Sequence, residues 1–265
     1  MKKILYFLFG VALLSLASCW PNDNWDEPDC TFYGTITDSY TNQPILTSQN
    51  DWVIRLWERS WTASEPQYQT IPIKQDGTYK NTKLFAGTFD MLPYDGPFWP
   101  VSDTTKNVVL GKSTEQNFTV TPYLQVIEFD NELGTANFGS AQTPDIKPAL
   151  TLRCRLKAPL KSRNGVNLPN LVEVKAFLSL NALCGNSSYI NITDYNSKRI
   201  QINRSWSSEM TNRFGLDGST ETSGVYSIGP LQVKSGYTYH VRIGANVSVG
   251  NNRYIYSPIV KVTVP

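Results

Sequence analysis

The side chains that most often perform catalysis are scarce in this chain. Its 265 residues include a single histidine, His240, and four cysteines. A Ser-His-Asp or Cys-His site needs a histidine or an equivalent base held by an orienting group. Sequence alternation places His240 on a strand face with Thr238 and Arg242, which is typical of a solvated or hydrogen-bonded histidine. Paired carboxylates that converge in space remain an alternative for glycoside hydrolysis, but no motif singles out a pair, and we predict that the protein is not an enzyme.

The sequence also offers little to a metal or a cofactor. It has no Cys-x-x-Cys pair, and one histidine does not make a zinc site of the usual Cys/His kind. It has no Asp-x-Asp-x-Asp-Gly calcium loop. The stretch from Gly134 to Gly139 lacks the lysine and the strand-to-helix context of a phosphate loop. We therefore predict no cofactor and no metal.

Cys19 follows a short apolar segment at the start of the chain. Lys2 and Lys3 precede the apolar run 4–16, and Leu16-Ala17-Ser18-Cys19 ends it. This is the layout of a secretory signal, and it resembles the lipobox of bacterial lipoproteins. The resemblance implies that residues 1–18 are removed and that the Cys19 thiol is acylated. A transmembrane anchor is the alternative, but a span needs about 20 apolar residues and this run is shorter.

The segment 19–29 is acidic and contains no basic residue. It resembles the acidic stretch behind the lipidated cysteine in surface-exported lipoproteins of Bacteroidetes, which implies a lipid-anchored protein of the outer membrane, displayed at the cell surface. A solvated tether is a second reading, compatible with the first. Without residues 1–18, the formal charge falls from +2 to about zero. Such a chain lacks the basic patch that nucleic acid requires, and we predict no nucleic-acid partner.

The three remaining thiols are an odd set. Exported proteins form disulfides, and Cys154 with Cys184 is the pairing we favour because both lie in the later half of the chain. Sequence alone does not fix this connectivity.

Residues 30–123 read as short strands separated by turns. Aromatic residues make up 12% of the chain, a composition that favours β structure. In the run 52–57, Trp52, Ile54 and Leu56 share one face, and Val53, Arg55 and Trp57 share the other. The ordered elements 34–38, 41–45, 75–79 and 85–89 resemble the transthyretin-like, carboxypeptidase-regulatory-type β-sandwich.

Residues 124–265 again read as strands, with a boundary near 121–123. Leu150, Leu152, Cys154 and Leu156 alternate with polar residues, as in a half-buried strand. The segment 231–262 resembles the last strands of a fibronectin type III-like sandwich, with Tyr237 as the corner tyrosine six residues after Leu231. Tyr237 is expected to share a face with Tyr239, Val241 and Ile243. We therefore predict an all-β protein of two tandem sandwiches, 30–123 and 124–265.

Together these features resemble a family of small Bacteroidetes lipoproteins of unassigned function, encoded in polysaccharide-utilisation loci beside SusC/SusD-type transporters. The resemblance implies a carbohydrate-uptake setting and carries no established catalytic residues.

Aromatic side chains in polar or turn-rich segments are the candidate glycan contacts, because ring faces pack against the C–H faces of sugars. The candidates are Trp61, Tyr94, Phe98, Trp99 and Trp206. Each has a structural alternative. Trp57, beside Trp61, fits a core position better. Phe98 and Trp99 are also suited to cap the sandwich or to pack on the second domain. Trp206 is expected in a loop.

These expectations define a non-catalytic lipoprotein that binds polysaccharide or oligosaccharide at the outer membrane. Two alternatives remain open at this point. One is an assembly partner of a SusC/SusD-like transporter that uses the same aromatic surface, and the other is a surface adhesin subunit.

Overall fold

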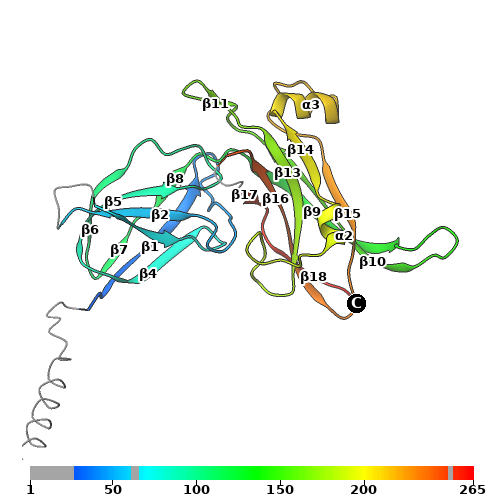
Figure 1. Cartoon of the computed structure of the whole chain (residues 1–265), viewed down its shortest axis with the longest axis horizontal. Coiled ribbons are helices and arrows are strands. Elements are labelled where there is room, and N and C mark those ends of the chain that lie inside the picture. Colours follow the sequence, from blue (N-terminus) through cyan, green and yellow to red (C-terminus); the bar gives the residue numbers. More distant parts are fainter. Residues whose placement is uncertain (1–26, 61–65, 250–252) are drawn as a thin grey trace, which may run out of the picture.

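The computed structural model of the chain describes residues 27–60, 66–249 and 253–265, and strands dominate this part of the protein (Figure 1). Several predictions concern residues outside this part of the chain. They are the predicted signal segment 1–18, Cys19, most of the acidic segment 19–29, and Trp61. Neither helix of the described part is long and apolar enough to cross a membrane. The prediction of an all-β fold with two tandem sandwiches is confirmed.

The first sandwich consists of two sheets that pack face to face. One sheet has the order β4-β1-β7, with β8 also paired to β1, and its strands are β1 (Cys30–Asp38), β4 (Thr78–Leu84), β7 (Ser113–Glu115) and β8 (Phe118–Val120). The other has the order β3-β2-β5-β6, and its strands are β2 (Val53–Glu58), β3 (Tyr68–Pro72), β5 (Gly87–Tyr94) and β6 (Thr105–Leu110). The pairings of β1 with β7 and β8 are parallel, and the other pairings are antiparallel.

Strict alternation fills the core of this sandwich. Every second residue of β1 is buried, and Gly34 is one of them. A Cβ atom at Gly34 would lie 2.1 Å from the backbone oxygen of Gln116, so the close approach of the neighbouring segment requires glycine there. In β2, Ile54 and Leu56 are buried beside Trp52, as predicted, which leaves Val53, Arg55 and Trp57 on the outer face.

The second sandwich also has two sheets. One has the order β15-β10-β9, and its strands are β9 (Gln125–Asn137), β10 (Ile146–Lys157) and β15 (Tyr226–Gln232). The other has the order β14-β13-β16-β17, with β18 also paired to β16, and its strands are β13 (Leu171–Ser179), β14 (Ile200–Arg204), β16 (Thr238–Val247), β17 (Tyr254–Tyr256) and β18 (Val260–Thr263). A short hairpin of β11 (Ser162–Arg163) and β12 (Val166–Asn167) extends from this sandwich.

The alternation predicted for 150–156 is confirmed in β10. Its leucines and Cys154 are buried, whereas Arg153 and Arg155 lie on the outer face. There they pair with acidic residues of the adjacent strand β9, Arg153 with Glu132 at 2.6 Å and Arg155 with Glu128 at 2.9 Å.

The expected corner tyrosine is wrong by two positions. Tyr237 precedes β16 and is exposed, whereas Tyr239 is buried. The hydroxyl oxygen of Tyr239 accepts a hydrogen bond from the backbone N–H of Lys234 at 3.1 Å. The strand begins one residue after Tyr237, so the alternating face starts at Tyr239.

Two short helices, α2 (Thr193–Ser197) and α3 (Trp206–Phe214), interrupt the β structure. Helix α3 corrects the expected loop at Trp206. The Ser205 hydroxyl caps its N-terminus by accepting from the backbone N–H of Ser208, and Gly215 ends it at φ 63°. Trp206 is buried, and its indole N–H donates to the Thr220 carbonyl at 2.6 Å. Its ring therefore offers no face to a ligand.

The predicted disulfide is wrong, because Cys154 and Cys184 are free thiols in different environments. Cys154 lies in the main core, whereas Cys184 lies in a small separate cluster with Phe177 and Tyr256. Burial raises the pKa of Cys154 to about 12 and that of Cys184 to about 11.

Polar contacts join the two sandwiches. Arg242 of β16, 1% exposed, donates to the carbonyl of Thr47 in the first sandwich at 2.8 Å and stacks on the Tyr256 ring at 3.7 Å. The hydroxyls of Ser48 and Ser187 hydrogen-bond across the same junction at 2.6 Å.

A second set of contacts at the junction is ionic. Arg253 of the second sandwich binds Asp51 and Asp95 of the first, each at 3.1 Å. These contacts fix the segment that follows β5 against the second sandwich.

Candidate binding surface

A pocket of about 570 Å³ opens where the end of β5 meets the β11–β12 hairpin of the second sandwich. Its walls come from both sandwiches, which lie beside one another (Figure 1). The first sandwich contributes Leu92, Tyr94, Phe98, Trp99 and Tyr123, and the second contributes Arg163, Asn164, Val166, Pro169 and Val249. The hairpin turns at Asn164-Gly165, both at positive φ, a pair of residues that favours tight two-residue turns.

Phe98 and Trp99 line this pocket as buried residues. Phe98 is 4% exposed and packs edge-on against Trp52, with ring centroids 5.0 Å apart. Trp99 is 2% exposed and packs on Tyr123 at 5.1 Å. Both rings therefore cap the sandwich, as the structural alternative for them predicts, and neither presents an exposed face to a glycan. Burial of the large apolar rings is favourable, so they fold into the core although the surrounding residues form a turn.

The turn before these rings explains how they fold back. Asp95 has a positive φ of 61°, and Gly96 follows it. A Cβ atom at Gly96 would lie 2.0 Å from the ring of Phe98, so only glycine lets Phe98 return over the edge of the sandwich.

Tyr94 differs from its neighbours because it is 40% exposed. It lies at the end of β5, on the outer face of the β3-β2-β5-β6 sheet, and lines the pocket as well. The guanidinium carbon of Arg55 lies 3.2 Å from the centroid of the Tyr94 ring and 4.1 Å from that of Tyr68. Cation–π attraction favours both contacts.

The contacts continue to Trp57, whose ring centroid lies 6.1 Å from that of Tyr68. The expected core position of Trp57 is wrong, because Trp57 is half-buried on the outer face of the sheet, and Tyr68 is 46% exposed. Tyr94, Arg55, Tyr68 and Trp57 thus form a row across strands β5, β2 and β3, which we call the aromatic strip. One end of the strip opens onto the pocket.

Of the five predicted ring contacts, the structure therefore brings three to the pocket, Tyr94, Phe98 and Trp99. Only Tyr94 of these presents an exposed ring. Arg55 and Tyr68 were missed by the sequence reasoning. Alternation in β2 does place Arg55 on the outer face, but the position of Tyr68 depends on the β2–β3 register, in which it pairs with Trp57.

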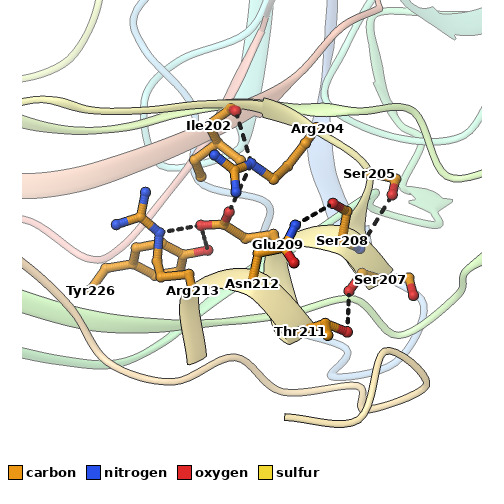
Figure 2. A network of polar contacts seen from close by, with 10 residues as sticks. All are labelled: Ile202, Arg204, Ser205, Ser207, Ser208, Glu209, Thr211, Asn212, Arg213 and Tyr226. Carbon is orange, nitrogen blue, oxygen red and sulfur yellow. Dashed lines mark hydrogen bonds and ion pairs between the residues drawn. The ribbon is translucent and has the colours of Figure 1, made fainter. Parts of the chain in front are cut away.

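Buried acidic residues outside this surface have structural partners. Figure 2 shows Glu209 of α3, which is fully buried and contacts Arg213, the Tyr226 hydroxyl at 3.1 Å, and Arg204 at 3.4 Å. These partners lie on α3, β15 and β14, so Glu209 joins the helix to the sandwich. Across 27–60, 66–249 and 253–265, no group of three or more His, Cys, Asp or Glu residues is arranged to hold a metal ion.

Comparison with known proteins finds one family model that matches the first sandwich. Residues 30–121 match the family model described as Protein of unknown function (DUF3823) N-terminal domain. No curated protein matches the chain.

Solved structures from Bacteroides and Parabacteroides resemble the chain over most of its length. A DUF3823 family protein of Bacteroides uniformis has a TM-score of 0.63 at 20% identity, covering 90% of this chain and 100% of its own. A second Bacteroides uniformis protein, described as a candidate carbohydrate binding protein, has a TM-score of 0.60 at 22% identity, covering 89% and 100%. A DUF3823 family protein of Parabacteroides merdae gives 0.59 at 16%, covering 90% and 100%. At these identities the likeness establishes a shared fold.

Proposed function

We propose that this protein is a non-catalytic, lipid-anchored accessory that binds polysaccharide at the outer membrane through the aromatic strip and the adjoining pocket. The observation that carries the proposal is the row of half-exposed rings beside a concave site.

The shape of this surface suits an extended saccharide. Tyr94 and Tyr68 present exposed rings on a rigid sheet, and exposed apolar clusters mark interaction sites. The pocket supplies buried rings below and polar side chains such as Asn164 at its edge, the usual combination in ligand sites. A sugar unit in the pocket would leave the rest of its chain free to follow the strip.

The description of the Bacteroides uniformis relative as a candidate carbohydrate binding protein supports the same function. That relative shares the fold along its entire length, so the comparison involves both sandwiches.

Acylation of Cys19 would hold this surface near the membrane. More than one acyl chain gives stable anchoring, and confinement raises the effective concentration of a binding site beside a transporter. An exposed, outward-facing anchor agrees with the acidic character of residues 19–29.

Affinity electrophoresis against plant, host and microbial polysaccharides tests the proposal. The wild-type protein should be retarded by at least one polysaccharide, and Tyr94→Ala should weaken that binding about tenfold, the usual loss for an anchoring aromatic residue. Tyr40→Ala is a matched control, because Tyr40 is 49% exposed on a turn of the other sheet and should bind as the wild type does.

Two results would contradict the proposal. One is the absence of retardation by any polysaccharide of the panel. The other is equal binding by Tyr94→Ala and the wild type. In either case, retention of a SusC/SusD-like protein in pull-downs by the wild type, with loss in Tyr94→Ala, would instead favour the assembly role.

A further inference from the structure

The aromatic strip contains a cation, Arg55, that has no acidic partner among the residues that the structure describes. Within the described residues, no carboxylate oxygen lies within 4.0 Å of the guanidinium nitrogens of Arg55. Its Nε atom is shielded from solvent and has no hydrogen-bond partner there. The two flanking rings attract the charge but do not neutralise it.

Other arginines near the strip are neutralised. Arg59 binds Asp90 at 2.9 Å on the same sheet. Arg253 binds Asp51 and Asp95 at the junction. Asp90, Asp51 and Asp95 are thus paired with arginines other than Arg55. Glu58, the acidic residue of β2 itself, alternates to the opposite face from Arg55.

A second arginine, in the pocket, also lacks a carboxylate partner among the described residues. Arg163, on the β11–β12 hairpin, lines the pocket and is partly exposed. No carboxylate of the described residues lies within 4.0 Å of its guanidinium nitrogens. Tyr94, which lines the pocket and stacks on Arg55, links the two positions.

The geometry of Arg55 restricts what it can bind. Strands β3 and β5 flank β2, and each supplies one ring that contacts the Arg55 guanidinium. Because Nε is shielded, the two terminal nitrogens remain for a ligand, and they form a planar edge that matches a carboxylate or a sulfate bidentately. The surrounding rings lower the local dielectric, which strengthens an ion pair relative to one in open water.

We infer that the saccharide recognised here is acidic, with a carboxylate or sulfate group bound at the edge of Arg55 and further anionic units accepted near Arg163. This inference rests on the proposed function and specifies the substrate class for the same surface. Because the chain without residues 1–18 has a formal charge of about zero, such binding would come from these two local charges and not from a general attraction to polyanions.

Matched ligands test the inference on the unaltered protein. Polygalacturonate and its fully methyl-esterified form differ only in the carboxylate, and dextran sulfate and dextran differ only in the sulfate. We expect at least tenfold tighter binding of the charged member of one pair, with a loss of that advantage between 50 mM and 500 mM NaCl, because salt screens exposed charges.

Variants assign the effect to Arg55. Arg55→Gln should remove the tenfold preference for the charged member over the neutral member of the pair. Arg55→Lys, which keeps the charge but loses the planar fork, should retain part of the tenfold advantage.

Arg153→Gln is the control for net charge, because Arg153 lies on the second sandwich and pairs with Glu132. This variant should behave as the wild type does. Circular dichroism and thermal unfolding identify any variant that fails to fold, and the ligand pairs still decide the question on the wild type.

The outcomes separate the two proposals. Equal binding of charged and neutral members, lost in Tyr94→Ala, would overturn the acidic specificity and leave the carbohydrate function intact. Tighter binding of the charged member that is unchanged in Arg55→Gln would also overturn the assignment to this site. An absence of binding to all four ligands and to the wider polysaccharide panel would overturn both.

Discussion

Arg55 and Arg242 show how the environment decides the role of one residue type. Both lie in strands where alternation predicts an outer face. Arg55 is partly exposed between two rings, whereas Arg242 is covered by the first sandwich and donates to the Thr47 carbonyl. Burial lowers the pKa of Arg242, and its hydrogen bond to the Thr47 carbonyl joins the two sandwiches at the junction. The guanidinium group is therefore a candidate ligand contact in Arg55 and a structural contact between the two sandwiches in Arg242.

Thiol reactivity is a testable property at this scale. Because burial raises the pKa of Cys154 to about 12 and that of Cys184 to about 11, both are neutral thiols at pH 8 and poor nucleophiles. We expect iodoacetamide to leave both unmodified in the folded protein at pH 8 and to modify both in 6 M guanidinium chloride. Peptide mapping by mass spectrometry measures this. Rapid labelling of either thiol in the native state, or a disulfide between them, would contradict the structure.

At the scale of elements, Glu209 is the contact that holds helix α3 against strands β14 and β15. Replacement by Gln removes a buried charge that Arg213, Arg204 and Tyr226 all contact (Figure 2). We expect Glu209→Gln to lower the free energy of unfolding by about 2–3 kcal/mol, because the two arginines lose their negative partner and an amide N–H group replaces one acceptor oxygen. Urea unfolding gives this value, and hydrogen exchange should show reduced protection in 206–214.

Glu132→Gln is the matched control for that prediction. Glu132 pairs with Arg153 at 2.6 Å on an exposed strand face, and exposed pairs contribute up to about 1 kcal/mol. Equal destabilisation by the two substitutions would show that burial of Glu209 has no special weight.

The strands were largely predictable because their signal is local. Period-two burial in β2 and β10 follows directly from the order of apolar and polar residues. Helix α3 was missed, although Ser205 as a cap and Gly215 as a terminator were visible in the sequence, because a tryptophan among serines was interpreted as a loop. Tyr237 lies one residue before the start of β16, so the error there is an error in the predicted start of that strand.

The candidate surface was only partly predictable because it depends on distant segments. Tyr94 was identified from its own turn-rich neighbourhood. The stacking of Arg55 between Tyr68 and Tyr94 depends on the registers of two strand pairs, and the pocket depends on the docking of one sandwich on the other. Neither is contained in a local pattern. The burial of Phe98 and Trp99 depends on packing against Trp52 and Tyr123 within the first sandwich.

At the scale of the whole molecule, the junction should respond to pH through Asp51. Burial raises the pKa of Asp51, and the adjacent Arg253 opposes this rise. A raised pKa in the folded state contributes stability that is complete below the ordinary value of about 4 and is lost as the pH rises through the raised value. Without Arg253, the pKa rises further and the loss extends to higher pH.

We therefore expect Arg253→Gln to destabilise the protein more at pH 7 than at pH 4. Urea unfolding at the two pH values measures this, with Arg153→Gln as a surface control. A difference from the wild type that is the same at both pH values would show that Asp51 and Arg253 are not coupled in this way.

The proposed membrane anchor of the molecule is Cys19. We expect native protein to fractionate with membranes and its first peptide to contain a diacylated cysteine by mass spectrometry, as the Leu16–Cys19 pattern implies. Cys19→Ala should remove this modification and the membrane association. An unmodified thiol in the wild type, or a soluble secreted pool, would contradict the prediction.

The pocket has a base from one sandwich and a wall from the other. The wall is a hairpin of a few residues around Asn164-Gly165 that contributes little to either core, whereas the base is packed against Trp52 and Tyr123. Substitutions within residues 163–166, natural or from a library, should therefore change the ligand preference of the pocket and leave the melting temperature constant. Diversity among proteins of this architecture should accordingly concentrate there.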